Sequence, residues 1–391
     1  MTQHDLKPLG AAARRAAPCA AVCLAIALAA CGGGGGSGGS GGGGSSTGTP
    51  SLPLRIVYAS AYQFTANTTL TSGIYAFRFD PNTDRFQAAN SIPFGPKTIG
   101  APITISRGGK FLYSIELQSS PLAAFAIQPD GSLVSVAGEP FDAGEPIATV
   151  AANPAADFLY AIAMSGDLQV YSIDPSSGAL TMRSMVSAPA AGGNALITPD
   201  GRFLYDTTPT GIYEFSIDAV TGALTQLAGS PVAYTIVPGP GAIHPSGKFL
   251  YITNADPSVT SNAQLSAWSI DSQTGALTAI ALSPAAVTAA QQLSVTIDGS
   301  GQFAIVTTAA SDSAGCYYEA AIDASTGLLT PLPGVGTAVE CGPMVADASY
   351  NFLYGGSSGV AVYLLNQQGV PQFISAGVLP GLHVMYIAAV P

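Results

Sequence analysis

The sequence predicts an all-β fold, a seven-bladed β-propeller closed by its C-terminal strand. A hydrophobic triplet close to Phe-Leu-Tyr recurs at intervals of about 40 to 50 residues, the usual length of a four-stranded propeller blade. Most copies are followed by a strand that ends in Ile-Asp and by a turn close to Thr-Gly-Ala-Leu-Thr. The triplets begin at Phe111, Phe158, Phe203, Phe249 and Phe352, with variants at Ile56 and Phe303.

Residues 1–30 have the features of a lipoprotein signal peptide. Lys7, Arg14 and Arg15 precede an apolar run, residues 16–30, that is too short and too rich in alanine for a stable membrane span. The run ends in Leu-Ala-Ala before Cys31, which is the form of a bacterial lipobox. We therefore expect Cys31 to carry a lipid that anchors the protein in the bacterial cell envelope, at the outer membrane because Gly rather than Asp follows it.

Residues 31–50 are almost entirely Gly and Ser and predict a flexible tether. Its end-to-end distance would be roughly 20 to 25 Å. Residues 51–391 then form the propeller domain.

Blade three shows the repeating unit most clearly. Lettering the strands A to D from the channel outward, strand A is expected at 147–152, B at 158–163, C at 168–173 and D at 180–186. Turns such as 218–222 begin with an Asp that can bond backbone amides and end with a Gly that tolerates positive φ. The A strands of the other blades are expected near Pro102, Ala195, Gly241, Leu293 and Pro343.

The two ends of the domain together supply one blade. Residues 55–59, 73–79 and 86–92 read as strands B, C and D of a blade that lacks strand A. Residues 383–390 read as an A strand with no strand B after it. The C-terminal strand is therefore expected to complete the first blade, which removes the open sheet edges.

Charge and hydropathy agree with this architecture. Only 9% of residues are charged and the mean hydropathy is +0.37, because blades that pack face to face bury their strands on both sides. The formal net charge is −11, and it becomes −13 when residues 1–30 are removed. Such a surface repels phosphate backbones, so nucleic acid is not an expected partner. We expect a monomer without a cofactor.

Two cysteines, Cys316 and Cys341, would remain in the mature domain besides the lipidated one. In an oxidising envelope they are expected to form a disulfide, although two separate buried thiols are the alternative. No metal site is expected, because the mature chain has only two histidines, His244 and His383, and a metal would need further ligands.

Over residues 54–391, the Phe-Leu-Tyr strand, the Asp-x-x-Thr-Gly-x-Leu-Thr turn and the count of seven blades resemble the lactonase-type propeller family. That family includes 6-phosphogluconolactonase and a fungal muconate cycloisomerase. Members that look catalytic carry Gly-Pro-Arg-His before an A strand, then Phe-His-Pro-x-Gly-Lys, then a strand that ends in Asn-Glu. Here the turn is present at 243–248, but Gly239, Pro240 and Ala255 stand at the positions of Arg, His and Glu.

Polar residues near the start of the A strands are predicted to form a ring at one mouth of the central channel. A ring of this kind can bind a small ligand, and the alternative is a wet rim with no specific ligand. His244 lies in an A–B turn at the opposite face and is expected to be structural. The ring comprises Lys97, Glu145, Asn194, Tyr234, Gln291, Glu340 and His383.

These observations favour a non-catalytic binding or scaffold lipoprotein whose partner is an unidentified protein or small molecule. Lactone opening needs a group that moves a proton and a group that stabilises developing negative charge, and Gly, Pro and Ala supply neither. The alternative is a lactone hydrolase whose active groups lie elsewhere, with Lys97, Glu145 and His383 as candidates. The two functions differ in whether the ring residues converge in one pocket with shifted pKa values.

Overall fold

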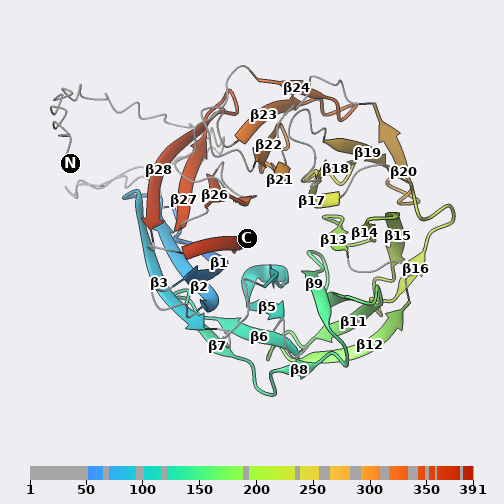
Figure 1. The fold of residues 1–391 in the computed structure, drawn as a ribbon, viewed down its shortest axis with the longest axis horizontal. Coiled ribbons are helices and arrows are strands. Elements are labelled where there is room, and N and C mark those ends of the chain that lie inside the picture. Colours follow the sequence, from blue (N-terminus) through green and yellow to red (C-terminus); the bar gives the residue numbers. More distant parts are fainter. Residues whose placement is uncertain are drawn as a thin grey trace, which may run out of the picture. The chain divides into compact units, whose positions relative to one another are not determined.

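The computed structural model describes residues 52–64, 70–93, 101–115, 121–187, 193–233, 238–254, 265–281, 292–308, 317–332, 342–347, 352–356, 359–378 and 382–390. These residues form seven antiparallel sheets around a central channel (Figure 1), within one compact unit that spans Pro50–Pro391. Apart from a 3₁₀ turn at Arg107–Gly109, their regular elements are all strands. No helix in these ranges is long and apolar enough to cross a membrane. The predicted seven-bladed propeller is confirmed.

Six blades are continuous in sequence, with strand A at the channel and strand D at the rim. Blade two has β4 (Ile103–Ile105), β5 (Phe111–Ile115), β6 (Pro121–Ile127) and β7 (Leu133–Ser135), and β8 (Phe141–Asp142) also pairs with β6. Blade three has β9 (Ile147–Ala152), β10 (Phe158–Ala163), β11 (Leu168–Ile173) and β12 (Leu180–Val186), with the predicted bounds. Blade four has β13 (Asn194–Ile197), β14 (Phe203–Thr208), β15 (Gly211–Ile217) and β16 (Leu224–Gln226).

The next three blades repeat this arrangement. Blade five has β17 (Pro238–Ile243), β18 (Phe249–Asn254), β19 (Ser266–Ile270) and β20 (Leu277–Ile280). Blade six has β21 (Gln292–Ile297), β22 (Phe303–Thr308), β23 (Tyr317–Ile322) and β24 (Leu329–Pro331). Blade seven has β25 (Met344–Ala346), β26 (Phe352–Gly355), β27 (Gly359–Leu365) and β28 (Pro371–Val378).

Blade one joins the two ends of the chain, as predicted. Its sheet has the order β29 (Leu382–Ala389), β1 (Arg55–Phe64), β2 (Leu70–Asp80) and β3 (Arg85–Pro93). Strands β1 and β29 are antiparallel, and the Val390 amide donates to the Ile56 carbonyl at 3.0 Å. The strands from the N-terminal part are longer than expected, because backbone pairing between β1 and β2 continues to Phe64 and Leu70.

The repeated triplet connects each blade to the next one. The Tyr205 hydroxyl of blade four donates to the carbonyl of Gly275, in the C–D turn of blade five, at 2.8 Å. Gly275 has a φ of +77°, and a Cβ atom there would overlap the Phe203 ring. Four more junctions carry the same hydroxyl-to-carbonyl bond: Tyr58 to Gly131, Tyr113 to Gly178, Tyr160 to Gly222 and Tyr251 to Gly327.

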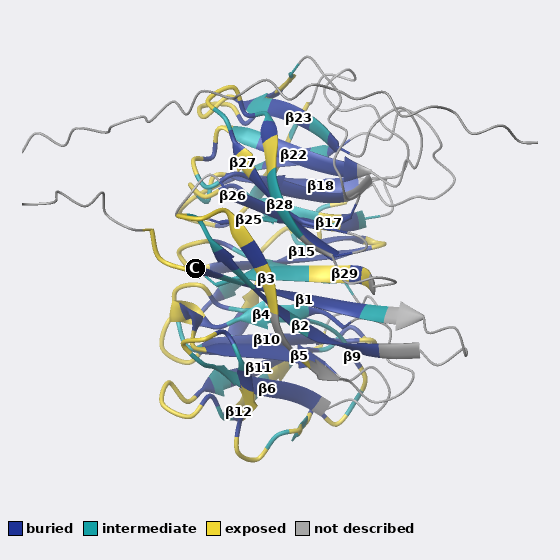
Figure 2. Ribbon diagram, turned by 90° about the vertical axis from the view of Figure 1, so that its left-hand side faces the viewer, coloured by how far each residue is buried: buried dark blue, intermediate teal, exposed yellow. Residues whose placement is uncertain are grey.

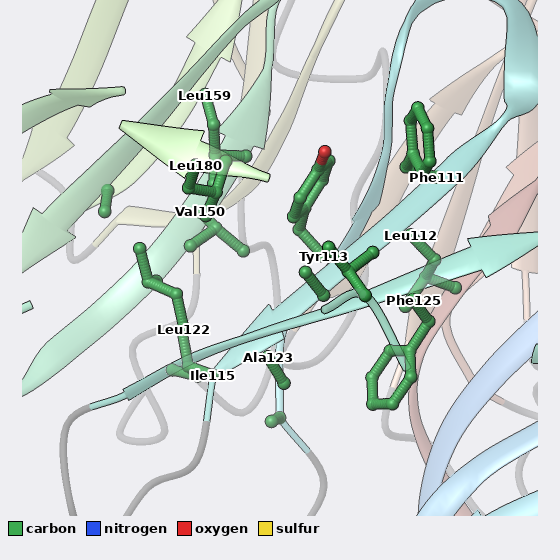
Figure 3. Packing of buried hydrophobic residues seen from close by; sticks show 14 of the residues in the cluster. Phe111, Leu112, Tyr113, Ile115, Leu122, Ala123, Phe125, Val150, Leu159 and Leu180 are labelled. Carbon is green, nitrogen blue, oxygen red and sulfur yellow. The ribbon is translucent and has the colours of Figure 1, made fainter. Parts of the chain in front are cut away.

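The core is therefore the set of spaces between neighbouring blades. Figure 3 shows one such cluster, in which Tyr113 and Ile115 of blade two lie with Val150, Leu159 and Leu180 of blade three. Their exposed fractions lie between 0 and 8%. Since each blade buries both faces in this way, the near-continuous apolar strands of the sequence follow directly.

The strand directions define two faces of the ring. Each A strand starts at the face of the D–A connections, the D–A face, and ends at the face of the A–B turns, the A–B face. Strand β1 starts at the A–B face and β29 ends there, since Val57 pairs with Ala389 and Gln63 with Leu382. Both ends of the described domain thus lie on the A–B face, and Figure 2 shows the C-terminus there.

Candidate functional site

The A strands of all seven blades line one cavity of about 590 Å³ in the channel, called the channel cavity. In β9, β17, β21 and β29 the lining residues lie near the middle of the strand, so the cavity lies inside the channel. No described lining residue carries a charged side chain. The polar side chains in the wall are Thr149, Asn194, Ser294 and Tyr386, and aliphatic residues, prolines, glycines and two methionines form the rest.

The closing strand β29 supplies the largest side chains of this wall. Its pairing with β1 shifts between Ser60 and Ala61, which leaves Met385 as the extra residue of a β-bulge. Met385 and Tyr386 both line the cavity and expose 42% and 38% of their surfaces. Although the Tyr386 side chain contacts the cavity, the surrounding protein desolvates its phenol and raises its pKa. The phenol therefore stays protonated at neutral pH and can donate a hydrogen bond.

Three of the seven predicted ring residues are described: Glu145, Asn194 and His383. Asn194, at the start of β13, lines the channel cavity. Glu145 and His383 are not among its described lining residues. The other four, Lys97, Tyr234, Gln291 and Glu340, lie outside the described residues.

Glu145 is held within blade three. Its carboxylate accepts hydrogen bonds from the Ser165 hydroxyl at 2.6 Å and from the Gln169 amide at 3.0 Å. Gln169 in turn accepts from the Tyr171 hydroxyl at 2.6 Å. This network connects the start of strand A to the turn between strands B and C, which is a structural role.

His383 lies at the rim of the channel mouth. Its side chain is exposed, and its ring stacks on Tyr62, with ring centroids 5.0 Å apart and planes inclined by 15°. Tyr62 of β1 and His383 of β29 are paired residues, so this stack lies at the D–A end of the two strands.

The positions that carry Arg and His in members of the resembled family lie at the channel. Pro240 lines the cavity and Gly239 is buried beside it. The backbone irregularity between Pro238 and Gly241 is closed by the Thr253 hydroxyl, which donates to the Pro240 carbonyl at 2.7 Å. Gly239 and Pro240 thus lie at the channel, as the resemblance implies for these positions, but neither residue has a side chain that can transfer a proton. Ala255 lies outside the described residues.

His244 is structural, as predicted. Its Nε2–H donates to the Gly301 carbonyl of blade six at 2.7 Å. Its Nδ1 accepts from the Ser246 amide at 3.0 Å, which assigns the proton to Nε2. The side chain is 5% exposed and connects the A–B turns of blades five and six.

Three buried carboxyl groups with raised pKa values were not predicted, and none of them lines the channel cavity. Asp206 is fully buried, neither of its oxygens has a hydrogen-bond partner, and burial raises its pKa to about 7. Burial also raises the pKa of Glu319 to about 7 and that of Glu214 above its ordinary value. A sequence signal existed: both glutamates stand four residues before the turn Asp, where blades one, three and five have Ala or Val.

The predicted lipidation site and disulfide involve three cysteines. Cys31, Cys316 and Cys341 all lie outside the described residues, and both assignments stay predictions. Among the described residues, no group of three or more His, Cys, Asp or Glu side chains could hold a metal ion.

Known proteins resemble this chain in family and in fold. The family model described as "Lactonase, 7-bladed beta-propeller" matches residues 61–195 and 203–313. No curated protein matches the sequence.

Solved structures match over most of the ring. One is a proposed 6-phosphogluconolactonase from Bacteroides fragilis, with a TM-score of 0.62, 18% identity and coverage of 86% of this chain and 98% of that one. A protein from Lactobacillus plantarum has a TM-score of 0.65, 18% identity and coverage of 86% and 100%. The periplasmic gluconolactonase PpgL from Pseudomonas aeruginosa has a TM-score of 0.59, 14% identity and coverage of 86% and 99%. At these identities the likeness shows the fold alone.

Proposed function

Because the chain belongs to the lactonase family of seven-bladed β-propellers, we propose that it is a lipid-anchored envelope protein that binds an uncharged ligand in its channel cavity and does not hydrolyse lactones. One observation carries this proposal. The cavity is lined by the A strands of all seven blades, and its described wall has no charged side chain.

Lactone hydrolysis needs more than this wall offers. A general base must have a pKa near the working pH, and the oxyanion must meet a cation or a set of hydrogen-bond donors. Tyr386 is the only titratable side chain in the described lining, and its raised pKa makes it a donor rather than a base. Of the predicted catalytic candidates, Glu145 is held by Ser165 and Gln169, and His383 stacks on Tyr62.

The same wall suits an uncharged, partly apolar ligand. Its volume of about 590 Å³ matches a small organic molecule. Met344, Met385 and Ile387 provide apolar contact, and methionine adapts to irregular shapes. Asn194 and the Tyr386 hydroxyl provide hydrogen-bonding groups that would fix the orientation of the ligand.

Two assays test the proposal. The purified protein should accelerate hydrolysis of phosphorylated and plain lactones no faster than buffer. An uncharged fluorescent probe such as N-phenyl-1-naphthylamine should bind, and Met385→Lys should weaken binding about tenfold by placing a charge in an apolar wall. Met182→Lys is the matched control, because Met182 is 49% exposed on the outer strand of blade three. Equal loss in both variants would contradict binding in the channel.

Lipid anchoring is tested separately. We expect intact-mass analysis of membrane fractions to show a mature chain that begins at an acylated Cys31. Cys31→Ala should release the protein from the membrane or block its processing. An unmodified N-terminus elsewhere would contradict the anchor and leave the ligand proposal unaffected.

The alternative function is a lactone hydrolase, and the family to which the chain belongs favours it. In that case turnover should exceed the buffer rate and should fall on substitution of Lys97, Glu145 or His383. This outcome would replace the non-catalytic proposal.

A further inference from the structure

A second cavity, of about 820 Å³, lies on the A–B face and is called the arginine cavity. Its walls come from the A–B turn of blade three, the C–D turn of blade four and the outer strand β12. Arg107, from the A–B turn of blade two, and Arg183, from β12, both line it. Two arginines in one cavity stand out in a chain with only 12 basic residues and a net charge of −11.

Arg107 is positioned by a single bond to the neighbouring blade. Its Nη1 donates to the Ala155 carbonyl at 2.7 Å. Within the described part of the chain no carboxylate lies within 4.0 Å of this guanidinium, so its remaining N–H groups have no acidic partner. The bond places a guanidinium at the edge of the cavity without neutralising it.

Arg183 is positioned in a comparable way. The pairing of β11 with β12 shifts so that Val170 faces Ser184 and Tyr171 faces Met182, which makes Arg183 the extra residue of a β-bulge. Its Nε donates to the Ser172 hydroxyl at 2.8 Å, which leaves both Nη groups for a ligand. Among the described residues, Arg183 also forms no ion pair.

The other lining groups limit the kinds of ligand that the arginine cavity suits. Asp157 lies in the same wall and can accept hydrogen bonds from hydroxyl groups, and Ser184 has an Oγ that is buried without a hydrogen-bond partner. The alanines of both turns have small side chains, so a ligand can approach the backbone of the wall closely. These alanines are Ala155, Ala156, Ala219 and Ala223. The cavity therefore combines two guanidinium groups, which suit phosphate or carboxylate, with one acceptor for hydroxyl groups.

We propose that the arginine cavity binds a small polyol phosphate, with the phosphate between Arg107 and Arg183 and a hydroxyl group on Asp157. Two charge-assisted contacts hold the anion, and the Asp157 carboxylate disfavours a ligand that lacks hydroxyl donors. This site is separate from the channel cavity, so it does not depend on the function proposed above.

Calorimetric titration of the purified full-length chain with glycerol 3-phosphate tests the site, with glycerol and inorganic phosphate as comparison ligands. Glycerol 3-phosphate should bind more tightly than either. Arg107→Gln and Arg183→Gln should each weaken binding about tenfold or more, and added salt should weaken it further. Asp157→Asn should lower the preference for glycerol 3-phosphate over inorganic phosphate.

Arg202 offers the matched control. Its Nη1 also donates to a carbonyl of the next blade, that of Ser272, at 2.9 Å, but Arg202 does not line the arginine cavity. Arg202→Gln should therefore bind glycerol 3-phosphate as the wild type does. The proposal is overturned if the wild type does not bind the probe, or if the double variant of Arg107 and Arg183 binds it unchanged while its thermal unfolding matches that of the wild type.

A lipid headgroup could present the same phosphate chemistry. Co-sedimentation with vesicles of phosphatidylglycerol, compared with vesicles of phosphatidylcholine, separates the two sources. Binding of glycerol 3-phosphate together with sedimentation that is lost in the double variant would support the site and assign its phosphate to a lipid. Binding of glycerol 3-phosphate without sedimentation would support it with a soluble ligand.

Discussion

Two glutamates at the same position of the repeat meet different partners. Glu214 of blade four accepts a hydrogen bond from the backbone N–H of Leu277, the first residue of β20 in blade five, at 2.8 Å. The equivalent residue for Glu319 of blade six is Pro371, the first residue of β28, and proline has no N–H. Glu319 thus lacks this donor, and burial raises its pKa to about 7.

Pro371→Leu should supply the missing donor and lower the pKa of Glu319. A carboxyl group whose pKa is raised by folding favours the folded state below its unfolded value, about 4.3, and this contribution is lost as the pH rises through 7. The variant should therefore gain stability at about pH 8.5 and little at about pH 5, as measured by urea unfolding. The reverse change, Leu277→Pro, should make Glu214 behave as Glu319 does. Equal effects at both pH values would contradict this assignment.

Asp206 predicts a second pH-dependent contribution. Its carboxyl group is fully buried without a hydrogen-bond partner, and its pKa of about 7 means that the protonated form is favoured in the folded state. The unfolding free energy of the wild type should fall as the pH rises from about 4 through 7. Asp206→Asn has no charge to desolvate, so it should exceed the wild type by about 2 kcal/mol at pH 8.5 and match it near pH 4. Parallel pH profiles would rule this out.

These residues show why the site was harder to predict than the fold. The polar ring assumed that residues at the start of each A strand point into the channel. Glu145 instead turns to Ser165 and Gln169, and a bulge brings Met385 and Tyr386 into the wall. Neither the local bulge nor the cross-strand partners could be read from the repeat, because both depend on how neighbouring strands meet in space.

At the scale of the element, the residues that repeat in the sequence are the ones that make contacts between neighbouring blades. At four junctions both the Phe and the Tyr of the triplet contact the turn glycine of the next blade, so triplet and turn are needed together there. For this reason the blade count, the closure and the bounds of blade three could be predicted from the sequence alone. The pattern encodes packing that five of the seven junctions between described blades share.

Gly275→Ala tests this contact at the blade four to five junction. The substitution introduces both a strained φ of +77° and an overlap with the Phe203 ring. Gly108→Ala is the control, because Gly108 has a φ of +75° and a Cβ atom there would meet nothing within 4 Å. Thermal unfolding should show a loss about 2 kcal/mol larger for Gly275→Ala. A similar loss in both variants would mean that φ strain alone explains the glycine.

At the scale of the whole molecule, the ring has one weaker sector. Blade six has Ile305 in place of the triplet tyrosine, so no hydroxyl reaches the turn of blade seven. Blade one has Asp84, with a φ of 53°, in place of the turn glycine that would meet blade seven. A buried ion pair between Arg55 of β1 and Asp347 of blade seven, at 3.3 Å, supports that second junction instead.

Blade seven should therefore open before the other blades. Native-state hydrogen exchange should give lower opening free energies for the amides of β26 and β27 than for those of β10 and β11 in blade three, which are buried to a similar extent. Deletion of residues 382–391 should abolish this difference, because the closing strand is lost and the whole ring is destabilised. Uniform protection around the ring in the intact protein would contradict a weak sector.

The position of the two chain ends has a consequence for traffic of molecules to the protein. Since β1 begins and β29 ends on the A–B face, any chain attached at either end leaves the ring on the side of the arginine cavity. The D–A mouth of the channel is on the opposite side, so solutes that enter it need not pass the attached chain. A tag or a surface linked to either end should therefore hinder access to the arginine cavity more than access to the channel.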